Sequence, residues 1–153
     1  MPIRPVVNWR NALAYKLSGL FTQKINNIAP LPNTFNIKNT TDLIQKLQDT
    51  PMAPHFTLAT LDITNLYSNI PVLETKAILK NALEYHQTHP QTQKELMWYN
   101  VTTRQNYFIH NHDIISQHDG LAMGAPSSGL IAEFFLQHRK YTSGMPSTQT
   151  QNH

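Results

Sequence analysis

The sequence predicts an α+β fold, because helical and strand patterns alternate irregularly along the chain. Helical periodicity is clearest in residues 12–28 and 72–87, where apolar residues recur every three or four positions. Two β-rich runs flank Asn111 and His112 within residues 106–117 and indicate a hairpin. We therefore expect several helices packed on a small antiparallel sheet.

The composition indicates one ordinary domain. The chain has 153 residues, of which 40% are hydrophobic and 14% are charged, so it can bury a real core. Its net charge of +3 comes from scattered lysines and arginines, which permits a nucleic-acid partner without requiring one. The absence of cysteine excludes disulfides and thiolate metal sites and is typical of an intracellular protein, in the nucleus or the cytoplasm. No apolar run approaches the roughly 20 residues that cross a membrane, so we expect no membrane partner.

The first third of the chain predicts an extended piece and a helix. Prolines in residues 2–7 push their preceding residues toward extended geometry. The helix over 12–28 ends before Pro30 and Pro32. Its apolar face contains Leu13, Leu17, Leu20, Phe21, Ile25 and Ile28.

A short helix and a strand are expected next. Thr40 or Thr41 is the predicted cap of the short helix. The apolar residues of this helix are Leu43, Ile44 and Leu47. Pro51 and Pro54 then precede residues 56–63, whose apolar run predicts a buried strand.

The second half predicts three further helices. The helix over 72–87 offers the core Leu73, Ala77, Leu79, Ala82, Leu83 and His86. Another begins at Pro90, a residue favoured in a first helical turn, and ends at Trp98 or Tyr99. The last covers Leu130 to Arg139 and contains Ile131, Phe134 and Phe135. Residues 141–153 lack periodicity and are expected to form a disordered polar tail after a domain of residues 1–140.

Asp62 is the first candidate functional residue, because it ends an apolar strand where aspartate is rare. It has two readings: a carboxylate that caps a turn, or a ligand of a hard cation such as Mg²⁺. Tyr67, five residues later, is by itself more typical of a core aromatic than of a ligand contact.

The second candidate is the loop over residues 119–129, which contains Gly120, Gly124 and Gly129. Glycines let the backbone approach a ligand closely, and Ser127 and Ser128 stand at a predicted helix N-terminus that favours anions. A plain turn explains the loop equally well. The eight histidines match no zinc spacing and are interpreted as surface residues.

Three segments follow one another along the chain: PIRPVVNWR near the start, DITNLYSNIP from Asp62, and GLAMGAPSS from Gly120. In this order they resemble the reverse transcriptases of Penelope-like retroelements, and the resemblance covers about residues 2–138. It implies part of a right-hand polymerase, comprising the end of a fingers motif and the palm as far as motif B. The implied activity is RNA-directed DNA polymerase, a nucleotidyltransferase with an RNA template, a DNA primer and dNTPs as partners.

The resemblance also implies roles for individual residues. Asp62 looks like the first metal-binding aspartate of motif A, with the Ile63 carbonyl as a further Mg²⁺ ligand. Tyr67 falls where such enzymes place an aromatic ring that excludes a 2′-hydroxyl. Arg4 looks like a fingers residue that meets template or triphosphate. The motif B residues carried over as nucleotide-binding are Gly124, Ala125 and Pro126.

The chain departs from the family where the second half of the metal site would be. Nucleotide transfer uses two Mg²⁺ ions about 4 Å apart, which need several carboxylates. No two aspartates of this chain are adjacent, and Glu133 is its one acid after the glycine loop. We therefore expect a truncated polymerase piece that is inactive alone. The alternative is a non-catalytic, nucleic-acid-binding remnant of the same fold.

Overall fold

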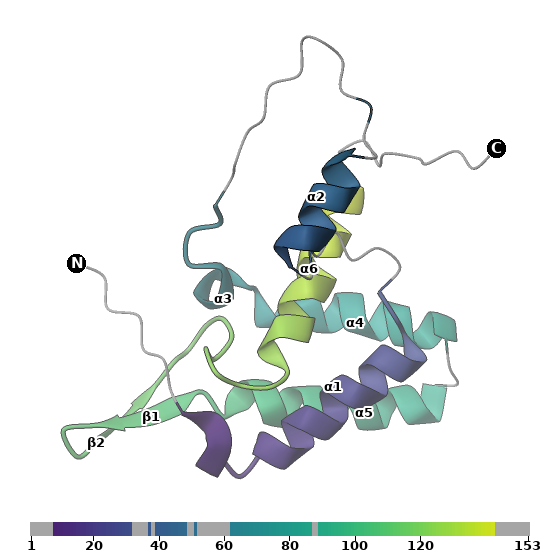
Figure 1. Cartoon of the computed structure of the whole chain (residues 1–153). Helices are drawn as coiled ribbons and strands as arrows, with labels where there is room; N and C mark the ends of the chain where they lie inside the picture. Colours follow the sequence, from purple (N-terminus) through teal and green to yellow (C-terminus); the bar gives the residue numbers. More distant parts are fainter. Residues whose placement is uncertain are drawn as a thin grey trace. The chain divides into compact units, whose positions relative to one another are not determined.

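The computed structural model describes residues 8–31, 37, 39–48, 51, 62–86 and 89–142 (Figure 1). The chain divides into two compact units, one comprising Met1–Leu31 and Asn65–His153 and the other Pro32–Thr64. Three expected features lie outside the described residues: the extended piece over 2–7, the strand residues 56–61, and the tail from residue 143. Asp62 and Ile63 are described, and neither belongs to a strand.

The described part of the first unit is mixed α+β, as predicted. Most of its elements are helices, and one antiparallel pair of strands is the sheet. In chain order the elements are η1 (Trp9–Asn11), α1 (Tyr15–Ile28), α3 (Leu66–Asn69), α4 (Val72–His86), α5 (His89–Arg104), β1 (Tyr107–His110), β2 (Asp113–Ser116) and α6 (Ser128–Thr142). No helix of the described residues is long and apolar enough to cross a bilayer.

α1 starts three residues later than predicted, because residues 12–14 form a turn after η1. The N–H of Ala12 donates to the Trp9 carbonyl at 2.9 Å, and that of Tyr15 to the Ala12 carbonyl at 3.0 Å. Phe21 and Ile25 are fully buried, as the apolar pattern predicts. The prediction is wrong for Leu13 and Leu20, which are 88% and 56% exposed.

The core lies among the helices. α5 packs against both α1 and α4, and α4 also packs against α6 (Figure 1). Buried side chains from all four meet there: Phe21, Ile25, Leu79, Leu83, Tyr99, Ile131 and Phe134. The rings of Phe21 and Tyr99 meet edge to face, with centroids 6.2 Å apart. Of the residues that the periodicity of α4 offered to this core, Leu73, Ala77 and His86 are exposed instead.

α5 is longer than predicted and continues to Arg104. Its last turns contain Thr102 and Thr103, which are β-branched and have weak helix propensity. Both are buried, and their hydroxyls donate to the Tyr99 carbonyl at 3.1 and 2.8 Å. These bonds satisfy threonine within a helix, which overrides its weak helix propensity.

The predicted hairpin is present. Tyr107 pairs with Ser116 and His110 with Asp113, so Asn111 and His112 form the two-residue turn. Both turn residues have positive φ, 50° and 69°, as the tight turns between twisted strands require. Both strands are largely exposed, and Phe108 is their one half-buried residue. The helices therefore pack on each other rather than on a sheet.

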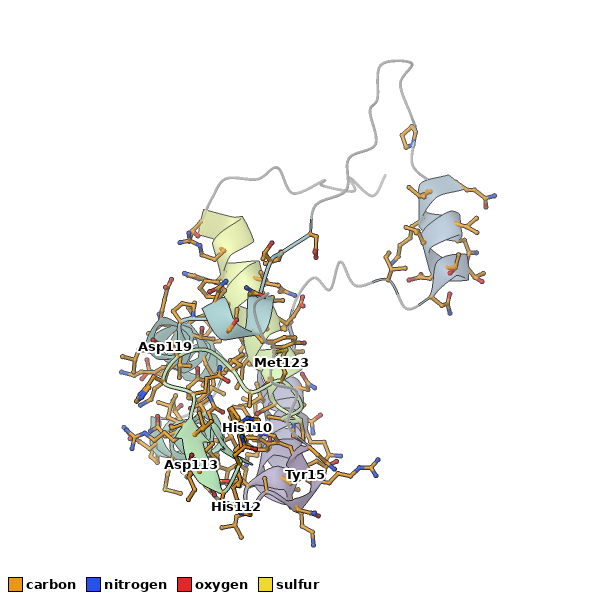
Figure 2. All side chains as sticks on the ribbon, turned by 90° about the vertical axis from the view of Figure 1, so that its left-hand side faces the viewer. Tyr15, His110, His112, Asp113, Asp119 and Met123 are labelled. Atoms are coloured by element: carbon orange, nitrogen blue, oxygen red, sulfur yellow. The ribbon has the colours of Figure 1, made fainter. Side chains whose placement is uncertain are left out.

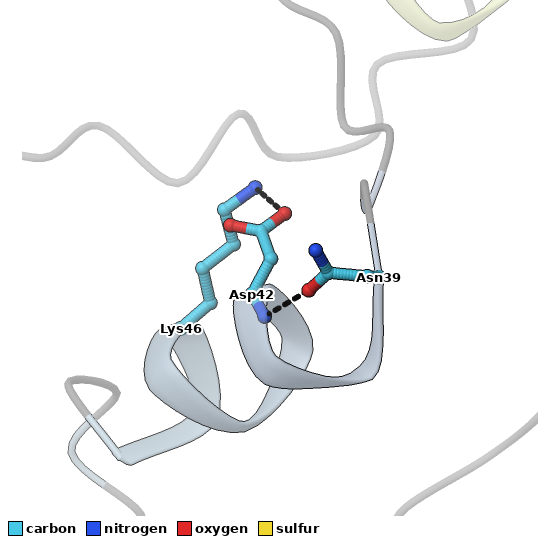
Figure 3. A network of polar contacts seen from close by, with 3 residues as sticks. All are labelled: Asn39, Asp42 and Lys46. Atoms are coloured by element: carbon cyan, nitrogen blue, oxygen red, sulfur yellow. Dashed lines mark hydrogen bonds and ion pairs between the residues drawn. The ribbon is translucent and has the colours of Figure 1, made fainter.

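The described part of the second unit contains the short helix α2 (Thr40–Gln48), as predicted. Its cap is Asn39 rather than either threonine, because the Asn39 side-chain oxygen accepts from the N–H of Asp42 at 2.9 Å (Figure 3). Asp42 and Lys46 form an ion pair at 3.3 Å along the same helix. The apolar side chains of α2 are exposed by 41–50%: Leu43, Ile44 and Leu47.

Candidate functional site

The turn around Tyr67 and the glycine loop lie backbone against backbone. The N–H of Leu121 donates to the Tyr67 carbonyl at 2.7 Å. Gly120, the preceding residue, has φ of +77°, and a Cβ built on it would lie 2.5 Å from the Cα of Ser68. Only glycine fits here, since both the conformation and the space exclude a side chain.

A second left-handed residue sets up the Tyr67 side of this contact. Asn65, with φ of 54° and ψ of 43°, immediately precedes the single turn of α3. The Ser68 hydroxyl donates back to the Asn65 carbonyl at 3.1 Å, and the N–H of Asn69 does so at 3.1 Å. Asparagine tolerates this conformation better than most residues, so the sequence itself turns the chain toward the glycine loop.

The base of the hairpin holds the start of the loop. Asn106 precedes β1 and is buried, and its side-chain amide donates to the Gly120 carbonyl at 3.1 Å. Gln117 follows β2; its N–H donates to the Asn106 carbonyl at 2.7 Å, and its side chain to the Asp119 carbonyl at 2.7 Å. Neither residue is among the candidates predicted from the sequence. The sequence does place an amide side chain at each end of the predicted hairpin, which is the one feature that could have identified them.

The far end of the loop is fastened to α1 by buried hydroxyls. The Ser18 hydroxyl accepts from the N–H of Ser127 at 2.9 Å and donates to the Ser127 hydroxyl at 2.8 Å. The Thr22 hydroxyl lies 3.4 Å from the Pro126 carbonyl, and the Ser128 hydroxyl donates to the Ala122 carbonyl at 2.7 Å. Ser127 and Ser128 do stand at the start of α6, but their hydroxyls serve the fold. Anion binding at this helix N-terminus stays a prediction.

The remaining candidate residues differ in how far the structure describes them. Gly124 is exposed, with φ of 112°, and Ala125 and Pro126 beside it are half-buried, so part of the loop backbone faces solvent. Tyr67 is half-buried and packs against the edge of the core. Asp62 and Ile63 are exposed and belong to the second unit. Arg4 lies outside the described residues.

No group of three metal-ligating side chains gathers within the described residues. Histidines and acids occur on the hairpin and the loop after it, where Figure 2 labels His110, His112, Asp113 and Asp119. All four are exposed. The site therefore consists of the loop between the Tyr67 turn and α6, part of whose backbone is exposed to solvent. Met123, in the middle of this loop, is half-buried (Figure 2).

Comparison of the chain with protein-family models, with curated proteins and with solved structures finds no match. Function is therefore inferred from the residues of this chain and their arrangement.

Proposed function

We propose that this chain is a piece of a retroelement reverse transcriptase, similar to those of Penelope-like elements. The observation that carries the proposal is the contact between Tyr67 and Leu121. The two sequence motifs that support the resemblance, DITNLYSNIP and GLAMGAPSS, come from distant parts of the chain. Their backbones meet at a hydrogen bond of 2.7 Å, and the glycine of the second motif fits against the first. Such a meeting is expected of two motifs that build one polymerase site, and it supports the proposal.

Each candidate residue would have its own role in nucleotide transfer. Asp62, with the Ile63 carbonyl, would supply part of the Mg²⁺ site, and the metal would activate the primer hydroxyl and stabilise the leaving pyrophosphate. Tyr67 would lie under the incoming sugar and select dNTPs over ribonucleotides. The exposed backbone at Gly124, with Ala125 and Pro126, would pack against the template base pair. Arg4 would meet the template or the triphosphate.

The same reading predicts that the chain does not polymerise alone. Mg²⁺ loses its water shell reluctantly and needs near-octahedral support, which a single aspartate does not provide. Asp62 is the one acid of its motif, and Glu133, the one acid after the loop, lies within α6. In the family that this chain resembles, the further carboxylates of the Mg²⁺ site come from an Asp-Asp hairpin, the third palm motif.

A gain of activity tests the proposal more sharply than its absence. The palm segment with the Asp-Asp pair, from an active Penelope-like reverse transcriptase, is joined after α6, and primer extension is measured on an RNA template with Mg²⁺. We expect extension by the chimera, none by the original chain, and none by the chimera carrying Asp62→Asn. Extension by the original chain would contradict the predicted inactivity. A folded but inactive chimera, together with Mg²⁺-independent binding of an RNA–DNA duplex by the original chain, would favour the non-catalytic alternative.

A further inference from the structure

Residues of α1 and α5 line an open groove of about 400 Å³ on the surface of the first unit. Its lining is one stripe of α1 and one residue of α5: Leu20, Gln23, Lys24, Asn27, Ile28 and Trp98. The α1 residues bonded to the glycine loop, Ser18 and Thr22, belong to a different face of that helix. The groove is therefore separate from the candidate site described above.

Three of the six residues that line the groove are apolar. Leu20 is 56% exposed there, and Ile28 and Trp98 are half-buried beside it. The Lys94 ammonium lies over the Trp98 ring, 5.3 Å from its centroid. Because the lysine covers that face of the ring, a nucleobase could not stack on it. The rest of the Trp98 side chain remains available for hydrophobic contact.

The rim of the groove is positive. Lys24 lines it, Lys94 stands above Trp98, and Lys16 lies one turn before Leu20 on the same stripe of α1. α1 contains no acidic residue. The one acid of α5, Glu95, is fully buried, and its carboxylate lies 3.5 Å from the Lys24 ammonium. Three lysines against one buried carboxylate leave a net positive surface.

We propose that this groove docks a short acidic, amphipathic peptide segment of a partner protein. A large apolar side chain of the peptide would insert between Leu20 and Trp98, where its burial would drive association. Flanking carboxylates would pair with Lys16 and Lys94, which adds specificity and association rate. The amides of Gln23 and Asn27 would satisfy peptide backbone groups. A volume of about 400 Å³ is suited to one or two side chains rather than a whole domain.

A peptide selection tests the proposal while the partner is still unidentified. A random twelve-residue phage-displayed library is panned against the wild-type chain, and the enriched peptides are synthesised and their affinities measured by fluorescence anisotropy. We expect enriched peptides to combine a leucine or aromatic residue with at least two acidic residues. Enrichment of basic or uncharged peptides, or of none, would overturn the proposal.

Matched variants locate the binding site. Leu20→Asp should weaken the selected peptides at least tenfold, whereas Leu73→Asp, at an 83% exposed leucine of α4, should not. Lys94→Gln should weaken them several-fold, whereas Lys80→Gln on α4 removes the same charge elsewhere and should have little effect. Thermal melts establish that each variant is folded. If a variant and its control lost the same amount of peptide affinity, the attraction would be unspecific, and the groove would not be the binding site.

An oligonucleotide competitor separates the peptide from a nucleic acid as the ligand. If (dT)₁₂ displaces the selected peptide at lower concentration than unlabelled peptide does, the groove is a nucleic-acid site and the proposal is wrong. Asp62 plays no part in any of these measurements. Failure of peptide docking therefore leaves the proposed polymerase ancestry untouched, and the chimera experiment can fail independently of the groove.

Discussion

Leu121 donates its backbone N–H to the carbonyl of Tyr67 at 2.7 Å, with Gly120 pressed against Ser68 beside it. This contact joins the turn after Asp62 to the start of the glycine loop. It depends on backbone conformation and on the absence of one side chain. It is consequently sensitive to substitutions that leave the hydrophobic pattern unchanged.

Gly120→Ala should be strongly destabilising. The added methyl would meet the Cα and carbonyl of Ser68 at 2.5 Å, and alanine at φ of +77° is strained by about 1–2 kcal/mol before any clash. We expect a loss of about 2–4 kcal/mol in the free energy of unfolding, measured by urea denaturation. Gly19→Ala and Gly129→Ala are the controls: both lie within helices with nothing near the new methyl, and each should stabilise by roughly 0.5–1 kcal/mol. A Gly120→Ala protein as stable as wild type would disprove the close contact.

The Ser18–Ser127 pair should behave as one unit. Ser18→Ala removes the acceptor of the buried Ser127 N–H as well as the hydroxyl contact, so it should cost about 1–3 kcal/mol. Ser127→Ala leaves that N–H bond in place and should cost less. The double variant should be less destabilised than the sum of the two, which a double-mutant cycle measures. Additive losses would mean that the two hydroxyls do not interact.

Tyr99 should make stability fall at alkaline pH. Its ring is buried in the core and its hydroxyl donates to the Val72 carbonyl at 2.8 Å. Burial raises the pKa of Tyr99 well above its usual value of 10.0, because the charged form is desolvated. The folded state then holds this proton more tightly than the unfolded state. The contribution of Tyr99 to the free energy of unfolding is therefore fully present below about pH 10. Above that pH it decreases by up to about 1.4 kcal/mol per pH unit.

Tyr99→Phe isolates that contribution. The variant should lose about 1–2 kcal/mol at neutral pH, because the hydrogen bond from the Tyr99 hydroxyl to the Val72 carbonyl is lost. Above pH 10 the difference between the two proteins should shrink, since phenylalanine has no proton to lose. Urea titrations of both proteins at about pH 8 and about pH 10.5, on either side of the tyrosine reference value, measure this. A difference that is constant with pH would contradict the assignment to Tyr99.

Asp62→Ala should leave stability unchanged within about 0.5 kcal/mol, because Asp62 is exposed. A carboxylate that capped a turn, the other reading of this residue, would show a larger loss, about 0.5–2 kcal/mol. Urea denaturation of the two proteins distinguishes the readings. If the substitution leaves stability unchanged but abolishes primer extension by the chimera, Asp62 acts in the reaction and not in the stability of the fold.

His112→Gly should stabilise the hairpin by a few tenths of a kcal/mol up to about 1 kcal/mol. His112 holds φ of 69° in the second turn position, where glycine is the preferred residue after asparagine. The gain is offset in part by the greater freedom of glycine in the unfolded chain. Hydrogen-exchange protection of the β1 and β2 amides reports the local effect. Faster exchange in the variant would contradict the turn assignment.

The elements that the sequence predicts correctly are those whose pattern is local. Helical periodicity identifies α1, α4 and α6, and the pair Asn111 and His112 between two β-rich runs identifies the hairpin turn. These signals depend on residues within a few positions of each other, so distant contacts do not enter into them. The glycine loop is predicted for the same reason.

Which apolar residues are buried, and what holds the loop, was decided only by the tertiary structure. Leu20 and Phe21 have the same hydrophobic character, but Phe21 meets Tyr99 across the core while Leu20 lines an open groove. Asn106 and Ser18 look like ordinary polar residues until the chain brings Gly120 and Ser127 to them. A sequence reports side-chain chemistry and local period, whereas burial and hydrogen-bond partnership between distant residues depend on which surfaces the completed fold places together.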